Sequence, residues 1–232
     1  MAIPQRPIFQ SDYKQLSIMN ENKTIAVVGY VSSVFLSIAW LISTEPALAH
    51  HPSNGRLPNS FITGFMSGLG HPIIGIDHLT FVIAIGLLAA LSKKLGILIP
   101  LAFVTATAIG TGIHLQSVNL PAPELIIAAS VLVVGVFLAW ESRVSLPLLI
   151  VIGAIAGIFH GYAYGESIIG AQATVIGAYL LGFCGIQLGI SAIALYIGRA
   201  FADAKKFSIW LRLAGLIVGG IGLAFLSNVV LN

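Results

Sequence analysis

The chain has 232 residues, of which 57% are hydrophobic and only 8% are charged. Because a soluble domain carries about a quarter charged residues, this composition cannot build a water-facing surface and predicts an integral membrane protein. The formal net charge is +3, but the basic residues lie in short loops between apolar runs, which excludes the clustered basic face that binds nucleic acids. The single cysteine, Cys184, excludes a disulfide framework, and its apolar surroundings favour a packing role.

The N-terminal region is typical of a secretory signal peptide. Three basic residues precede an apolar stretch at 24–43: Arg6, Lys14 and Lys23. The small residues Ala47 and Ala49 follow, and we expect cleavage after Ala49. The apolar core of about 18 residues is long for a signal peptide, so a retained membrane anchor is the alternative. Residues 1–49 are therefore a predicted signal peptide or anchor helix, and in both cases residue 50 lies on the exported side.

Six further apolar runs are long enough to cross about 30 Å of hydrocarbon. They are residues 72–91, 95–115, 123–140, 146–164, 174–197 and 208–231. The stretch at 61–70 is also apolar, and its glycines favour a broken or re-entrant entry to the first run. Glycines four residues apart in the fourth and sixth runs predict close helix packing. We therefore expect an all-α fold in which residues 50–232 form a single domain, a bundle of six transmembrane helices.

The distribution of charge predicts the orientation of this bundle. With residue 50 outside, the loops after the first, third and fifth runs are cytoplasmic. These loops hold Lys93, Lys94, Arg143, Arg199, Lys205 and Lys206, whereas the outer segments hold Arg56. The positive-inside rule therefore also places residue 50 and the C-terminus on the exported side. The predicted location is a bacterial plasma membrane or a thylakoid membrane.

The histidines all fall in the exported half of this topology. They are His50, His51, His71, His78, His114 and His160. Three carboxylates join them there: Asp77, Glu124 and Glu166. Scattered structural histidines have no reason to gather on one side, so the distribution predicts a functional site in the exported half.

Asp77 and His78 are the strongest candidates, because an ionisable residue inside a membrane span is costly and usually functional. On a continuous helix, His71 and His78 lie on nearly the same face, and Asp77 is about one and a half turns from His71. Imidazoles with a carboxylate and no thiolate suit a borderline divalent metal ion such as nickel, cobalt or zinc. The structural alternative is a hydrogen-bonded Asp–His pair that only joins two helices.

The fourth run adds His160 and Tyr164, which are one helical turn apart beside glycines that let an ion or a helix approach. Glu166 falls at the membrane boundary, where a solvated carboxylate needs no special role. His114 ends the second run, where a histidine can simply turn toward the interface. His160 is therefore a candidate metal ligand, and Tyr164, Glu166 and His114 are secondary candidates.

Two other pairs of residues have a candidate role in a metal path. His50 and His51 could capture metal in the exported compartment, or they could simply mark the cleavage region. Gln187 and Cys184 could line a path through the fifth run, although core packing is the favoured interpretation for each.

The two membrane motifs resemble those of the HupE/UreJ family, which is associated with nickel or cobalt supply to hydrogenases, ureases and cobalt-dependent pathways. The pattern HPxxGxDH runs from His71 to His78, and Phe159-His160-Gly161-Tyr162-Ala163 matches the second motif. The resemblance covers residues 44–232 and implies that His71, Asp77, His78 and His160 take part in metal uptake. Glu166 lies close to where family members carry an acid.

One departure from the family pattern concerns the second motif. The family commonly continues HGxAHG, whereas Tyr164 stands here in place of the second histidine. A phenol binds divalent nickel or cobalt less readily than an imidazole does, so this span is expected to contribute one ligand and an altered selectivity.

The resemblance implies a permease for Ni²⁺ or Co²⁺, ahead of Zn²⁺, that captures the ion from the periplasmic or lumenal side. A nucleotide-binding loop is absent from the sequence, so we expect a secondary transporter and not an enzyme. One alternative is an intramembrane metal-dependent hydrolase, in which the histidines and Asp77 hold zinc and activate water. Another is a non-transporting metal-binding subunit of a larger membrane complex. The expected partners are the lipid bilayer, the metal ion, and a second copy or a membrane complex.

Overall fold

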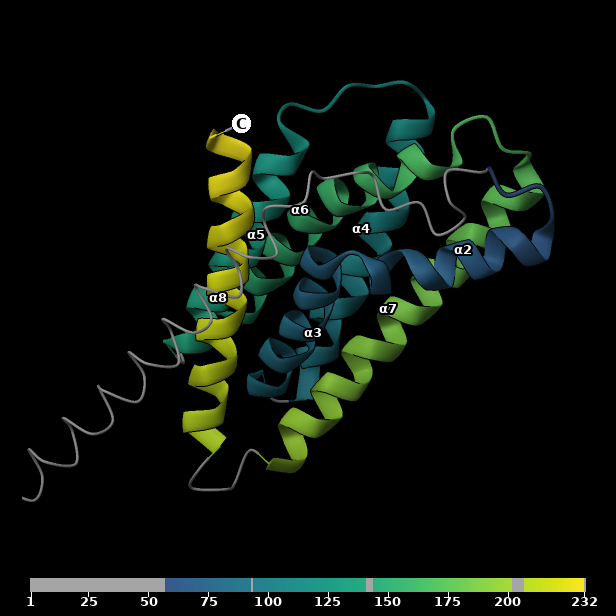
Figure 1. Ribbon diagram of the computed structural model, residues 1–232. Helices are drawn as coiled ribbons and strands as arrows, with labels where there is room; N and C mark the ends of the chain where they lie inside the picture. The colour runs from purple at the N-terminus through teal and green to yellow at the C-terminus, as the bar shows by residue number, and fades with distance from the viewer. Residues whose placement is uncertain (1–56, 93, 141–143, 202–206, 232) are drawn as a thin grey trace, which may run out of the picture.

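The computed structural model describes residues 57–92, 94–140, 144–201 and 207–231 (Figure 1). Within these ranges the protein is helical and contains no strand. The helices are α2 (Phe61–Ile74), α3 (Ile76–Leu91), α4 (Leu98–Leu115), α5 (Pro123–Ala139), α6 (Leu146–Gly165), α7 (Ala173–Phe201) and α8 (Phe207–Leu231). Two 3-10 helices, η1 (Lys94–Ile97) and η2 (Glu166–Ile168), adjoin α4 and α6. The predicted signal peptide or anchor at 1–49 lies outside the described residues, as do His50, His51, Arg56, Lys93, Arg143, Lys205 and Lys206.

Each predicted apolar run coincides with a helix, but fewer helices are long enough to span a membrane. Four segments are long and apolar enough: Lys94–Leu115, Leu146–Ile168, Ala173–Ala200 and Ile209–Leu231. The pair α2–α3 makes a fifth if its two halves form one span. Helix α5 is apolar but has only 17 residues. The described residues therefore support four to five membrane-spanning helices, and a sixth crossing by α5 stays a prediction.

The first predicted span is broken at Gly75. Helices α2 and α3 meet there with a bend of 80°, which Figure 1 shows as the turn from the blue helix into the centre of the bundle. Gly75 has an extended backbone, with φ −74° and ψ 106°, and this conformation interrupts the regular helix between the two segments. His71 and His78 therefore lie on two different helices, so the shared face expected of them on a continuous helix is not formed. The broken entry expected from the glycines of this region is observed.

Local sequence signals explain where several helices begin. Ser60 caps α2 through a capping box with Thr63, in which each side chain bonds the other residue's backbone N–H. Pro123 and Pro147 lie in the first turns of α5 and α6, where proline's missing N–H breaks no helical hydrogen bond. These boundaries are therefore determined locally.

Glycines bring the helix backbones into close contact, as their spacing predicts. The most extensive pairings are α4 with α6, α5 with α8, and α2 with α7. A Cβ at Gly161 would overlap the backbone of Thr107 on α4, and one at Gly215 would overlap that of α5. Gly153 and Gly219 are less confined, since their nearest neighbours would be 3.5 and 3.9 Å away. Small residues therefore set the helix separations, as is usual in lipid.

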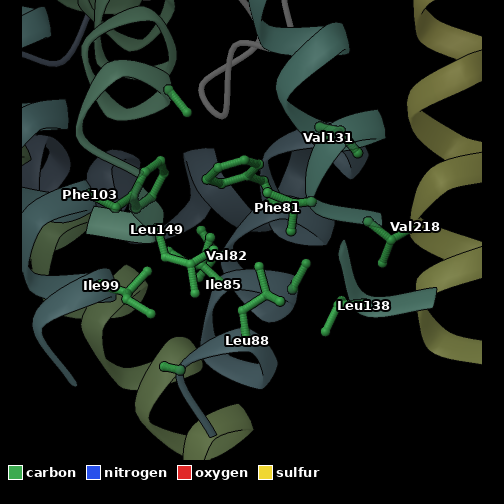
Figure 2. Close-up of a cluster of buried hydrophobic side chains, with 14 of the residues drawn as sticks. Phe81, Val82, Ile85, Leu88, Ile99, Phe103, Val131, Leu138, Leu149 and Val218 are labelled. Carbon is green, nitrogen blue, oxygen red and sulfur yellow. The ribbon is translucent and has the colours of Figure 1, made fainter. Parts of the chain in front are cut away.

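The main apolar core fills the centre of the bundle and ends against one histidine. It gathers buried side chains from α3 to α8, of which Figure 2 labels Phe81, Val82, Ile85, Leu88, Ile99, Phe103, Val131, Leu138, Leu149 and Val218. The ring centroids of Phe81 and Phe103 are 4.9 Å apart. They lie 4.6 and 5.6 Å from the ring of His160, so this aromatic pair forms the boundary between the core and the polar cluster described next.

Candidate metal site

Three predicted histidines meet at the end of the bundle where α3 and α7 begin and α6 ends. His71 lies in the last turn of α2, His78 in the first turn of α3, and His160 near the end of α6. The ring centroid of His78 is 4.8 Å from that of His160 and 6.4 Å from that of His71. The residues from the two sequence motifs are therefore neighbours in space.

Asp77 orients the ring of His78 from the same turn of α3. Its Oδ1 lies 2.7 Å from Nδ1 of His78, so we infer that Nδ1–H donates to the carboxylate and Nε2 carries the lone pair. Nε2 is buried and has no hydrogen-bond partner among the described residues. Gly75 leaves room for this pair, since a Cβ there would lie only 3.2 Å from Asp77 Oδ1 and from His78 Nδ1. Because both residues belong to α3, this hydrogen bond does not join two helices.

Ser130 on α5 orients the ring of His160 in the same way. Its hydroxyl donates to the carbonyl of Ile127 at 2.7 Å, and its oxygen lies 3.1 Å from Nε2 of His160. The serine hydrogen is thus engaged, so Nε2–H donates to Ser130 and the lone pair falls on Nδ1. In the described part of the chain, nothing hydrogen-bonds this fully buried Nδ1.

Two hydroxyl groups hold His71 from α7 and η2. Nδ1 of His71 lies 2.9 Å from the hydroxyl oxygen of Tyr179 and 3.3 Å from that of Ser167. Both hydroxyls reach the carbonyl oxygen of Tyr164, at 3.2 Å from Tyr179 and 3.0 Å from Ser167. Ser167 also donates to the hydroxyl oxygen of Tyr179 at 3.1 Å. With the Tyr179 hydrogen directed to the carbonyl of Tyr164, we infer that the Tyr179 oxygen accepts from Nδ1–H of His71, which leaves the lone pair on Nε2.

Tyr164 lies in the middle of the histidine cluster. Its ring centroid is 4.9 Å from that of His71 and 4.6 Å from that of His78. The side chain is fully buried, and its hydroxyl has no hydrogen-bond partner among the described residues. Tyr164 is thus a central member of the cluster.

The structure does not bring the other candidates into this group. Glu166 begins η2 and is exposed, and Glu124 is exposed in the first turn of α5. The ring of His114 packs against Tyr162, with centroids 4.2 Å apart, and not against the three clustered histidines. His114 and Glu166 therefore lie outside the histidine cluster, and the buried Nδ1 of His114 has no hydrogen-bond partner among the described residues.

The cluster offers nitrogen lone pairs in a buried setting, but it is not a closed coordination shell. Within the described ranges, no group of three or more His, Cys, Asp or Glu side chains is arranged to hold a metal ion as it stands. The unpartnered nitrogens of His78 and His160 belong to rings that are already adjacent.

The sequence analysis missed the three hydroxyl residues that orient the histidines: Ser130, Ser167 and Tyr179. Ser130 and Tyr179 are hydroxyl side chains inside apolar runs, which is a weak signal by itself. Ser167 follows Glu166, the residue that was singled out instead. Only the packing of α5, η2 and α7 around the histidines identifies these groups.

Comparison with known proteins matches a stretch of the chain that includes both motifs. The family described as HupE / UreJ protein matches residues 38–225. The chain belongs to the HupE/UreJ family. Protein HupE of Rhizobium leguminosarum bv. viciae is 31% identical to it over 166 residues, which cover 67% of this chain and 85% of that relative. No solved structure gives a significant match.

Family membership confirms the resemblance inferred from the two motifs. Together with the long apolar helices, it identifies an integral membrane protein. The residues of the two sequence motifs, His71, Asp77, His78 and His160, form the centre of the cluster, and Tyr164 lies among them.

Proposed function

We propose that the protein is a secondary permease for Ni²⁺ or Co²⁺, which it captures at the histidine cluster. The observation that carries the proposal is the pair of buried, unpartnered ring nitrogens, His78 Nε2 and His160 Nδ1. A buried nitrogen without a partner is costly, and each of these has its proton held on the other side of the ring by an oxygen. Metal-binding histidines typically show this arrangement, in which an oxygen orients the ring from behind.

In the proposed site, His71, His78 and His160 are the metal ligands and Asp77 is a positioning residue. The Asp77 carboxylate would keep the lone pair of His78 on Nε2 and offset the positive charge of the ion. Neutral imidazoles suit nickel and cobalt, and the absence of thiolate among these residues disfavours a copper(I) site. Tyr164 would line the site and contribute a weak oxygen ligand, which favours selectivity different from that of relatives with a histidine there.

We further propose that the ion enters from the exported side. The cluster lies where α3 begins and α6 ends. Lys94 lies in η1, after the end of α3 and before the start of α4, and thus at the opposite end of α3 from the cluster. Basic residues mark the cytoplasmic side, so this placement supports an outward-facing cluster. His71 and Asp77 are partly exposed and would form its entrance.

The test is uptake of radioactive ⁶³Ni²⁺ and ⁵⁷Co²⁺ into proteoliposomes that contain the purified full chain. Wild type, His78→Ala and His114→Ala are compared, and binding is measured on the same proteins by equilibrium dialysis. We expect wild type to accumulate one of the two metals and His78→Ala to lose both binding and uptake. His114→Ala is the matched control, because it removes a histidine outside the cluster, and its uptake should equal that of wild type.

Two results would overturn the proposal in different ways. Metal binding without accumulation would favour a metal-binding subunit or a metal-dependent hydrolase. Full uptake by His78→Ala would exclude the histidine cluster as the capture site.

A further inference from the structure

Helix α7 carries a line of buried residues that starts at the histidine cluster and runs away from it. Its members are spaced by four: Tyr179, Phe183, Gln187 and Ser191, all 1% exposed or less. Tyr179 bonds His71, and the ring of Phe183 lies 5.3 Å from that of Tyr164. At 1.5 Å per residue, Gln187 is about 12 Å further along the helix than Tyr179. The line therefore connects the cluster with the interior of the bundle.

Gln187 has an acceptor that nothing in the described residues satisfies. Its Nε2 donates to the carbonyl of Phe183 at 3.1 Å, which fixes the orientation of the amide. Its Oε1 is fully buried and has no hydrogen-bond partner within the described part of the chain. A buried carbonyl oxygen without a partner is destabilising, so a bound ligand at Gln187 Oε1 would remove this cost.

The surroundings of Gln187 place it on the α3-facing side of α7, at the midpoint of the helix. One turn further on, Ser191 lies against Gly86 of α3, whose missing Cβ makes room for its backbone. The Ser191 hydroxyl donates to the carbonyl of Gln187 at 2.7 Å, which leaves the lone pairs of its oxygen available. Two oxygen atoms on consecutive turns are thus presented deep in the bundle.

On the α3–α4 side of the cluster, the buried hydroxyls of Thr107 and Thr111 already donate to backbone carbonyls, and neither is an unpartnered polar atom like Gln187 Oε1. Phe81 and Phe103 lie against His160, and Ile85 and Ile99 continue the apolar filling behind them (Figure 2). A divalent cation among these apolar side chains would lack ligands, which is costly. The line on α7 instead offers a buried oxygen acceptor that is unpartnered among the described residues, Gln187 Oε1.

We propose that Gln187 Oε1, with the Ser191 hydroxyl, forms a second cation site that receives the metal ion after the histidine cluster. The inference rests on the proposed permease function and deepens it, because it assigns the inner half of the path. Amide and hydroxyl oxygens bind divalent nickel or cobalt more weakly than imidazoles do. A weak oxygen site beyond the stronger nitrogen site allows the ion to leave the histidine cluster and then to dissociate toward the inner side of the bundle.

The experiment separates binding at the cluster from passage beyond it. ⁶³Ni²⁺ binding by equilibrium dialysis and ⁶³Ni²⁺ uptake into proteoliposomes are measured for wild type, Gln187→Leu, Gln187→Glu and Gln116→Leu; ⁵⁷Co²⁺ is used if wild type prefers cobalt. Gln187→Leu should bind metal like wild type but take it up about tenfold more slowly or worse, which corresponds to a barrier raised by about 1.4 kcal/mol. Gln187→Glu retains an oxygen at this position and should restore uptake.

Gln116→Leu is the matched control, because it makes the same change at an exposed glutamine that bonds within its own helix. It should behave like wild type. Metal binding by Gln187→Leu also verifies that this variant is folded.

Wild-type uptake by Gln187→Leu would overturn the second site and leave the permease intact. Equal loss of uptake in Gln187→Leu and Gln187→Glu would also overturn it, since an oxygen at this position would then not suffice. Absence of uptake in wild type would overturn the permease and the inference together.

Discussion

The three clustered histidines share one chemical arrangement at the scale of single residues. Each has an oxygen acceptor on one ring nitrogen: Asp77 for His78, Ser130 for His160, and Tyr179 with Ser167 for His71. These acceptors come from four different elements. The lone pairs of His71 and His160 are therefore positioned by tertiary contacts, whereas that of His78 is positioned by Asp77 of its own motif.

Replacing Tyr179 with phenylalanine tests the importance of these acceptors. Tyr179→Phe removes the closest oxygen to His71 Nδ1 while retaining the buried ring, so His71 loses its orientation without a cavity. We expect the dissociation constant for the metal to rise about tenfold, at the lower end of the effect of removing a group that orients a ligand. Competition against a chromophoric chelator in detergent measures it.

Tyr196→Phe is the control for this prediction, since Tyr196 lies on the same helix and is 75% exposed. An unchanged affinity in Tyr179→Phe would mean that His71 does not bind the metal, or that Ser167 alone orients it.

The residues of the site were predictable only in part. His71, Asp77, His78 and His160 were recognised because ionisable groups within apolar runs are unusual. Their gathering was inferred from motif spacing, and the structure brings the three histidines together even though the helix that carries two of them is broken. Ser130, Ser167 and Tyr179 were not recognised, because a hydroxyl in a membrane helix ordinarily bonds its own helix and leaves no distinctive pattern.

At the scale of helices, the break at Gly75 decides how the first motif works. The backbone angles of Gly75 are open to any residue, so glycine is required there for space and not for conformation. A side chain would press on the Asp77–His78 pair, whose atoms lie 3.2 Å from the position of a Cβ. Packing against Asp77 and His78, the last two residues of the HPxxGxDH pattern, therefore explains the glycine of that pattern at position 75.

The contact between α4 and α6 gives a prediction for stability. Gly161→Ala places a methyl group into the backbone of Thr107, so the helices must separate. We expect the free energy of unfolding to fall by about 1–3 kcal/mol, the usual range for overpacking. Thermal unfolding in detergent, followed by circular dichroism, measures the accompanying fall in Tm.

Gly185→Ala provides the comparison, because a Cβ at this exposed position of α7 has nothing within 4 Å. That variant should be as stable as wild type or slightly more so, since alanine favours helix over glycine by up to about 1 kcal/mol. Equal losses in both variants would show that helix separation is not the cause.

At the scale of the whole molecule, the apolar surface agrees with a lipid environment. Large hydrophobic side chains are exposed on several helices, among them Leu181, Ile193, Trp210 and Leu231, each at least 60% exposed. A water-facing protein rarely exposes so many large apolar groups. The polar side chains that orient the histidines are instead buried between helices, as expected where lipid offers no hydrogen bonds.

The proposed orientation predicts which ends of the bundle can be labelled from outside. Glu166→Cys and Leu95→Cys, each in a Cys184→Ala background, place single thiols at opposite ends of the bundle on exposed residues. In intact bacterial spheroplasts, a membrane-impermeant maleimide should label Glu166→Cys. Leu95→Cys should react only after the membrane is permeabilised, because the positive-inside rule places it in the cytoplasm.

The Cys184→Ala parent, which has no cysteine, should remain unlabelled throughout. The opposite labelling pattern would mean that the histidine cluster faces the cytoplasm and that the proposed direction of capture is wrong.

The sequence by itself determined the membrane class, the positions of the apolar helices and the identity of the motif residues. Composition and local hydrophobic pattern are sufficient for these properties, because each depends on neighbours along the chain. Tertiary structure decided the bend at Gly75, the hydroxyl partners of the histidines and the burial of Gln187 at the middle of α7. These features depend on which helix faces come together, and that choice is made by packing between segments far apart in the sequence.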